Sequence, residues 1–187
     1  MTDDGTHKFR FDRVFGQGAS QAEVYEASVH PVIEEVLQGY NGTVFAYGQT
    51  SAGKTFTMVG GEGSREGMIP RALRQLFSTL SRSPDAWTLS VSLLEIYMER
   101  VYDLLVSDSS RPAQLSVYED QAGAVHIPGA VNVSVSTLQE TLDLLARGLA
   151  RRAVGAHRMN RVSSRSHAIL RVQLQQTVRD SQALATL

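Results

Sequence analysis

Residues 48–55 read Gly48-Gln49-Thr50-Ser51-Ala52-Gly53-Lys54-Thr55 and match the pattern G-x-x-x-x-G-K-[ST]. The glycines let the backbone curl so that successive N–H groups point inward, where they can bind phosphate oxygens. The lysine can reach the β- and γ-phosphates of a nucleoside triphosphate, and the hydroxyl of Thr55 can bind Mg²⁺. The stretch therefore predicts a phosphate loop, with ATP as the expected ligand.

The residues on either side supply the setting that such a loop requires. Thr43–Tyr47 is a short apolar run typical of a buried strand. A helix is expected to begin at Lys54, and its positive dipole end would face the phosphates. The alternative, a glycine-containing surface turn followed by a solvated lysine, does not account for this order of strand, loop and helix.

Apolar spacing along the rest of the chain alternates between the periods of strands and helices. A helical pattern runs from Ser20 to Gly39 and restarts at Pro31, while Gly60–Gly67 is expected to be a flexible loop. Further helices are expected from Pro70 and, behind a Thr137/Glu140 capping box, from Leu138. Strands are expected at residues 7–15, 87–95 and 166–178, with shorter ones at 115–117 and 125–135, and residues 96–105 fit either a strand or a helical turn. This alternation predicts an α/β layered domain.

The composition sets limits on the other functions open to the chain. Its 187 residues suffice for one compact domain, and the formal net charge of -1 gives no overall attraction to nucleic acid or an anionic membrane. The absence of cysteine excludes disulfides and thiolate metal sites. No apolar run has the length of a membrane helix, and no signal peptide is expected at the acidic N-terminus.

A second group of polar residues, Asn160–His167, lies between a basic helix end and the last expected strand. It contains two adjacent hydroxyls, an amide and an arginine, which together could meet a γ-phosphate, its metal ion and a water. The alternative is a serine-rich connector whose side chains bond to the local backbone. The residue types alone favour the connector.

Several longer stretches together resemble the motor domain of the kinesin family over residues 9–178. The stretches that carry the resemblance are Phe11–Phe15, Gly39–Thr50, Leu94–Tyr97, Tyr102–Leu105 and Asn160–His167, the last of which is similar to that family's switch I, N-x-x-S-S-R-S-H. The resemblance implies a P-loop NTPase-type three-layer sandwich and a microtubule-dependent ATPase. It also implies a cytoplasmic protein of the cytoskeleton whose partners are microtubules and tubulin, and whose ligand is Mg²⁺ with ATP.

The resemblance implies roles for particular residues. Ser164 would approach Mg²⁺ together with Thr55, Ser163 would help to hold the attacking water, and Asn160 would lie near the phosphates. Phe56 falls where the family often stacks a ring on adenine, although a buried core residue of the first helical turn is an equal alternative. Residues 106–133 are similar to a lobe that touches tubulin, for which a solvated hairpin is the alternative.

Parts of that family's domain do not occur in the 187 residues. The switch II segment D-L-A-G-S-E and the R-x-R-P strand are not present, so Arg165 has no expected partner. Asp103 and Asp143 follow helix-like patterns, and no apolar run after the last strand ends in an aspartate. We therefore expect a partial domain over residues 1–187, with a core at about 7–178, an incomplete central sheet and little or no ATP turnover. A non-motile form that binds nucleotide or a partner is the alternative function.

Overall fold

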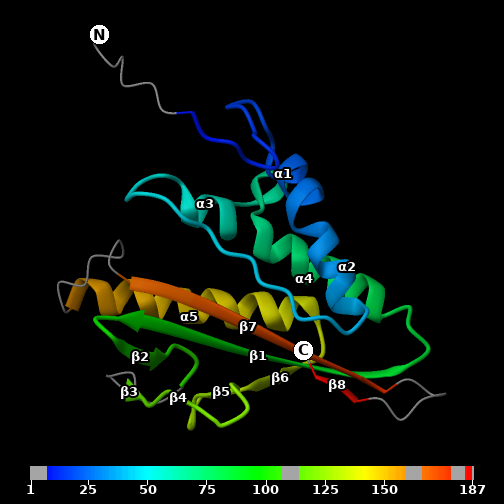
Figure 1. The fold of residues 1–187 in the computed structure, drawn as a ribbon, viewed down its shortest axis with the longest axis vertical. Coiled ribbons are helices and arrows are strands. Elements are labelled where there is room, and N and C mark those ends of the chain that lie inside the picture. Colours follow the sequence, from blue (N-terminus) through cyan, green and yellow to red (C-terminus); the bar gives the residue numbers. More distant parts are fainter. Residues whose placement is uncertain (1–7, 107–113, 159–165, 178–183, 187) are drawn as a thin grey trace.

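The computed structural model of the protein describes residues 8–106, 114–158, 166–177 and 184–186. In this part of the chain, helices and strands form the mixed α/β arrangement that the sequence predicts (Figure 1). No helix in the described part of the chain is long and apolar enough to cross a lipid bilayer.

The main sheet is built around one long strand, β1 (Ala86–Tyr97). Along its whole length β1 pairs antiparallel with β7 (Ser166–Thr177), from Ala86 opposite Thr177 to Tyr97 opposite Ser166. The other edge of β1 pairs with two shorter strands, and the sheet ends in one further strand on each side. These are β2 (Arg100–Asp103) and β6 (Val133–Val135) beside β1, β3 (Gln114–Leu115) beside β2, and β8 (Leu184–Thr186) beside β7.

The connection from β1 to β2 resolves the ambiguity over residues 96–105 in favour of strands. Met98 and Glu99 have φ of 49° and 61°, and they form a two-residue turn between the strands. Two consecutive residues with positive φ are typical of the hairpin turns whose twist matches that of the strands. Asp103 accordingly ends a strand, so the helix-like interpretation of its surroundings is wrong.

The α-helices in the described part of the chain pack together around one of them, α4 (Met68–Leu80). The helices are α1 (Gln21–Ser28), α2 (His30–Leu37), α3 (Lys54–Met58), the 3₁₀ turn η1 (Gly63–Arg65), α4 (Met68–Leu80) and α5 (Leu138–Arg158). The break between α1 and α2 falls just before Pro31, as predicted, because proline is accepted in the first turn of a new helix. α1 begins with a complete capping box between Ser20 and Glu23.

Two apolar clusters hold these elements together. The larger lies between β1, α4 and α5 and includes Leu80, Leu93 and Leu145. The smaller joins α1 and α2 to α4 through Tyr25, Ile33 and Leu76. A Cβ at Gly148 of α5 would lie 2.4 Å from Leu93 Cδ2, so the absence of a side chain lets α5 approach β1 closely.

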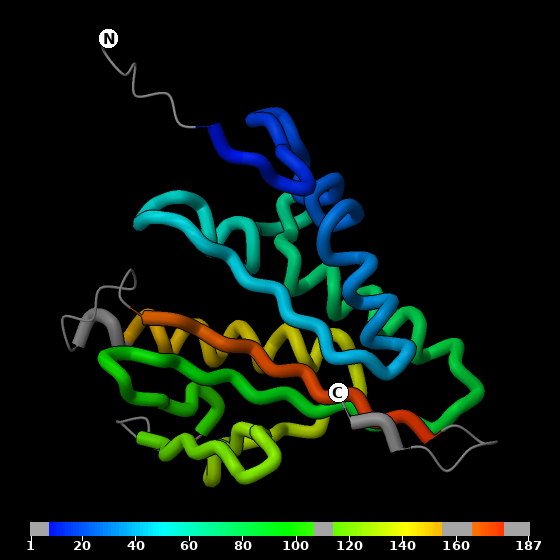
Figure 2. The backbone as a smooth tube through the Cα atoms, viewed as in Figure 1, coloured from blue at the N-terminus to red at the C-terminus, as the bar shows by residue number. Residues whose placement is uncertain are grey.

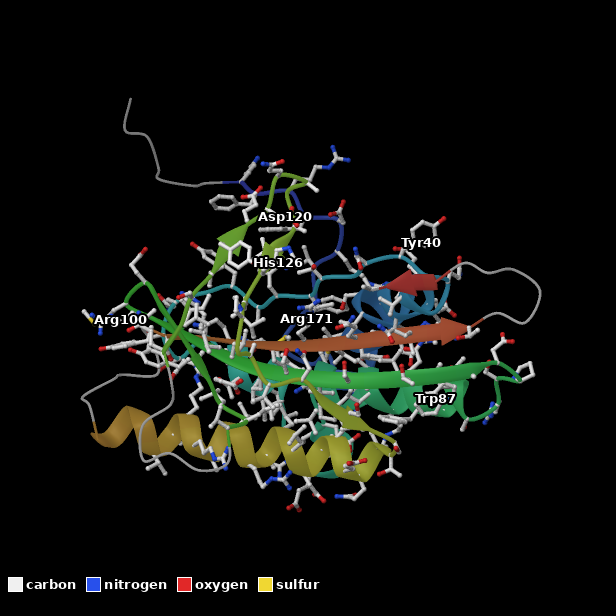
Figure 3. The ribbon with its side chains drawn as sticks, turned by 90° about the horizontal axis from the view of Figure 1, so that it is seen from below. Tyr40, Trp87, Arg100, Asp120, His126 and Arg171 are labelled. Atoms are coloured by element: carbon white, nitrogen blue, oxygen red, sulfur yellow. The ribbon has the colours of Figure 1, made fainter. Side chains whose placement is uncertain are left out.

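A separate two-stranded hairpin, β4 (Tyr118–Glu119) and β5 (Val125–His126), lies on the opposite side of the sheet from α5 (Figure 3). The Asp120 Oδ2 and His126 Nε2 atoms are 2.7 Å apart, and the Tyr118 and His126 rings stack. The short strands expected at 115–117 and 125–135 are thus present in part, as β3, β5 and β6.

Two predicted strands are wrong. The described residues of the N-terminal stretch, 8–15, form no strand, and Phe9 and Phe11 are exposed. Thr43–Tyr47 is extended but belongs to no sheet among the described residues, and Figure 2 shows it passing β7 outside the sheet. Phe45 is 80% exposed and Tyr47 is 94% exposed. An apolar run indicates a tendency to form a strand, but its side chains are buried only when neighbouring elements cover them.

Candidate nucleotide-binding site

The stretch from Gly48 to Thr55 forms a tight loop that leads directly into α3. Its fold depends on unusual backbone angles, because Gly53 has φ of 88° and the non-glycine Ser51 has φ of 67°. The Ala52 N–H donates to the Gln49 carbonyl at 3.2 Å and closes the turn. Left-handed backbone at a non-glycine residue costs free energy and is often found at ligand-binding loops.

The Lys54 side chain folds back across this loop. Its Nζ lies 2.7 Å from the Gly48 carbonyl oxygen and 2.7 Å from the Gln49 carbonyl oxygen. An ammonium group has three donors, so these two bonds leave one N–H for a further acceptor. Two backbone carbonyl oxygens of the loop therefore hold the charged ammonium group of Lys54 in place.

The first turn of α3 begins at Lys54, as predicted. Because a helix cannot satisfy its first four N–H groups internally, those of residues 53–56 are open to an acceptor from outside. The Thr55 side chain is exposed in this turn. The loop thus presents backbone donors, a fixed cation and a hydroxyl to solvent at one place, which is an arrangement suited to an anion.

Phe56 is 53% exposed. The alternative that this residue belongs to the core is therefore wrong. Its ring is available to a flat ligand beside the phosphate loop, as the adenine-stacking expectation requires. The Gly60–Gly67 segment that follows is a closed turn with a bridge between Gly60 and Glu66 and the 3₁₀ turn η1 within it.

The loop residues Gly48, Gln49, Thr50, Ser51, Ala52, Gly53, Lys54, Thr55 and Phe56 lie together in the structure. The other predicted site residues, Asn160, Ser163 and Ser164, lie outside the described residues, as does Arg165. Two described residues, one before and one after Asn160–Arg165, are hydrogen-bonded to each other. The Arg152 guanidinium donates to the carbonyl and the hydroxyl of Ser166, each at 3.0 Å.

Asp103 has a structural role that the sequence did not indicate. It is 2% exposed, and its Oδ1 and Oδ2 accept N–H bonds from Leu105 and Val131, both at 2.7 Å. Among the described residues, no group of three or more acidic or histidine side chains could hold a metal ion by itself.

Sequence reasoning missed one polar residue next to the loop. Gln21 is 8% exposed, and its side-chain amide donates to the carbonyl of Phe56 at 2.5 Å. The helical pattern that begins at Ser20 did not indicate this contact, because a local pattern cannot tell which face of a helix a neighbouring element will cover.

The fold and the loop together define an α/β protein of the P-loop NTPase type, and comparison with known proteins gives the family. A model of the kinesin motor domain matches residues 1–186. Kinesin-like protein 3 of Schizosaccharomyces pombe is 41% identical over 184 residues, which are 96% of this chain and 33% of that protein. A kinesin heavy chain of Gibberella moniliformis is 42% identical over 173 residues, 90% of this chain and 18% of that protein.

The solved structure of a fast kinesin matches with a TM-score of 0.88 and 39% identity over 95% of this chain. The chain belongs to the kinesin motor-domain family. It spans 51% of that solved chain and between 18% and 33% of the length of the two curated relatives.

Proposed function

We propose that the chain binds Mg·ATP at Gly48–Thr55, as the nucleotide site of a kinesin-type microtubule motor domain. The observation that carries this proposal is the position of Lys54. Its ammonium group is held by two carbonyl oxygens of the loop, with one donor left over, beside the open N–H groups of α3. Family membership supports ATP as the nucleotide.

Each residue of the loop has a distinct part in this proposal. Lys54 and the N–H groups of residues 53–56 bind phosphate oxygens, and Lys54 neutralises part of their charge. Thr55 contributes its hydroxyl to Mg²⁺, which when bound neutralises the charge that develops during phosphoryl transfer. Phe56 stacks on the base.

The remaining roles follow the resemblance. In this proposal Ser164 joins Thr55 at the metal ion, Ser163 holds the attacking water and Asn160 lies near the phosphates. The partner is the microtubule, and the location is the cytoplasmic cytoskeleton.

Equilibrium binding of a fluorescent ATP analogue with Mg²⁺ tests the nucleotide site. Lys54→Ala should weaken binding by at least tenfold, because about 1.4 kcal/mol corresponds to a tenfold change and a charged hydrogen bond contributes ~1.5–3 kcal/mol. Lys8→Ala is the matched control, since Lys8 is exposed and far from the loop in sequence. Equal binding by all three proteins would contradict the assignment.

One observation favours nucleotide binding without rapid turnover by residues 1–187. Thr43–Tyr47, which leads into the loop, pairs with no strand among the described residues, so the sheet does not fix the loop from that side. Catalysis of phosphoryl transfer depends on accurate positioning. Steady-state ATPase measurements with and without microtubules should give little activity. Strong stimulation by microtubules would show that the 187 residues contain a complete catalytic site.

A further inference from the structure

We propose that Gln21 is a positioning residue for the nucleotide site, because its buried amide holds the C-terminal end of α3, the helix that carries Lys54 and Thr55. The inference rests on the proposed function of the loop. It concerns a residue 27 positions before Gly48 in the sequence, on a different helix.

The contacts of Gln21 place it between two segments that follow the loop in the sequence. Its Nε2 atom lies 2.5 Å from the Phe56 carbonyl oxygen and 3.5 Å from the Arg65 carbonyl oxygen. The first contact reaches α3 and the second reaches η1. Since the side chain is 8% exposed, water does not compete strongly for these bonds.

The Phe56 carbonyl needs a donor from outside its helix. In a regular α-helix it would accept the N–H four residues later, that of Gly60. The Gly60 N–H instead donates to the Thr55 carbonyl at 3.3 Å, to which the Val59 N–H also donates at 2.8 Å. The last turn of α3 therefore leaves Phe56 O without its helical partner, and the Gln21 amide supplies the missing bond.

This bond matters because α3 has only five residues. So short a helix has little stability of its own and depends on tertiary contacts. α1, by contrast, is well anchored, since Ser20 and Glu23 cap its start and the Tyr25 hydroxyl donates to Gln75 of α4. Gln21 thus connects a fixed helix to the short one that aims Lys54, Thr55 and Phe56 at a ligand.

The first test compares two variants of α1. Gln21→Leu removes the donor and puts an apolar side chain of similar size in its place, whereas Tyr25→Phe removes a different hydrogen bond from the same helix. Both should lower the thermal midpoint. Only Gln21→Leu should weaken Mg·ATP binding, by about tenfold, the order expected for one buried hydrogen bond. A loss of affinity in Tyr25→Phe of the same size would mean that Gln21 has only a general structural role.

The second test uses Gln21→Glu, which keeps the shape of the side chain. An ionised carboxylate would face the Phe56 carbonyl and repel it, whereas a protonated carboxyl would donate its O–H and restore the bond. The ratio of the variant and wild-type dissociation constants should therefore fall toward one as the pH is lowered. A ratio that does not change with pH would contradict the proposal.

The third test does not depend on nucleotide binding. In the nucleotide-free protein, Gln21→Leu should raise the hydrogen-exchange rates of the Thr57, Val59 and Gly60 amides, and Tyr25→Phe should not. If the exchange rates change as expected but the wild type does not bind Mg·ATP, the proposed function fails and the positioning contact stands. If the exchange rates of these amides are the same in Gln21→Leu and wild type, the positioning role is wrong.

Discussion

The Arg152 guanidinium on α5 lies 3.3 Å from the Glu95 carboxylate on β1, and both groups are largely buried, with side-chain exposures of 19% and 4%. The same guanidinium donates to Ser166, the first residue of β7. One side chain thereby joins α5 to two strands of the sheet. Ser166 lies within the stretch that resembles switch I, and Arg152 lies eight positions before that stretch.

Arg152→Leu should lower the free energy of unfolding by about 3–5 kcal/mol, because it leaves the buried Glu95 carboxylate without this cation. Chemical denaturation measures the loss. Arg147→Leu is the control, since Arg147 lies on the exposed side of α5 and should change stability little. The double variant Glu95→Leu/Arg152→Leu should be more stable than Arg152→Leu alone. If Arg152→Leu is instead the more stable of the two, the loss of stability does not come from leaving Glu95 without Arg152.

Asp103→Ala should destabilise the protein by about 2–5 kcal/mol, because it removes two acceptors and leaves the N–H groups of Leu105 and Val131 unpaired. Denaturant unfolding again provides the measurement. Asp103→Asn keeps one carbonyl acceptor, so its free energy of unfolding should lie between those of the wild type and Asp103→Ala. A stability of Asp103→Ala equal to that of the wild type would contradict the structural role of this carboxylate.

The β4–β5 hairpin should loosen in acid. The hydrogen bond from His126, followed by the backbone N–H of Ala124, lowers the pKa of Asp120. A lowered pKa means that the carboxylate stabilises the hairpin above the ordinary aspartate pKa of about 3.9 and that this contribution is lost as the pH falls through the lowered value. Amide exchange at Ala122 and Ala124, whose N–H groups bond to Asp120, reports the change.

Asp120→Asn provides the control for this pH dependence. The amide cannot titrate, so the exchange rates in the variant, corrected for their intrinsic pH dependence, should not rise further in acid. If the variant and the wild type loosen alike, a different group is responsible for the transition.

Phe56→Ala should weaken ATP binding by about tenfold while leaving stability nearly unchanged, because stacking of a base on an aromatic ring contributes ~1–3 kcal/mol and the ring is 53% exposed. Competition by inorganic tripolyphosphate, which has no base, separates base binding from phosphate binding. The wild type and Phe56→Ala should bind tripolyphosphate with the same affinity. A parallel loss of affinity for tripolyphosphate would mean that Phe56 shapes the loop and does not bind the base.

The features that sequence predicts well here are the local ones. The start of α3 at Lys54, the restart of the helix before Pro31 and the Thr137/Glu140 cap each depend on residues within a few positions of one another. The pattern of the phosphate loop is local too, because its glycines and its lysine lie within one turn of the chain, but its binding of nucleotide stays a prediction. Such features need no knowledge of distant partners.

The features that sequence reasoning missed depend on distant partners. Thr43–Tyr47 has the composition of a buried strand, but burial requires a neighbour that a single run of residues cannot reveal. The turn at Met98 and Glu99 lacks the asparagine or glycine that usually marks two residues with positive φ. The contact from Gln21 to Phe56 spans 35 positions and left no pattern in the sequence.

The backbone amide signals of residues 48–56 during a titration with Mg·ATP test the central claim most directly. If the loop holds the phosphates, the NMR resonances of Gly53, Lys54 and Thr55 should shift with a single saturating dependence on ligand concentration. Those of the β4–β5 hairpin should stay in place, and in Lys54→Ala the shifts should require at least tenfold more ligand to reach their midpoint. Resonances of residues 48–56 that do not respond to Mg·ATP, or that respond at the same ligand concentration in Lys54→Ala and wild type, would contradict the assignment of this loop as the nucleotide site.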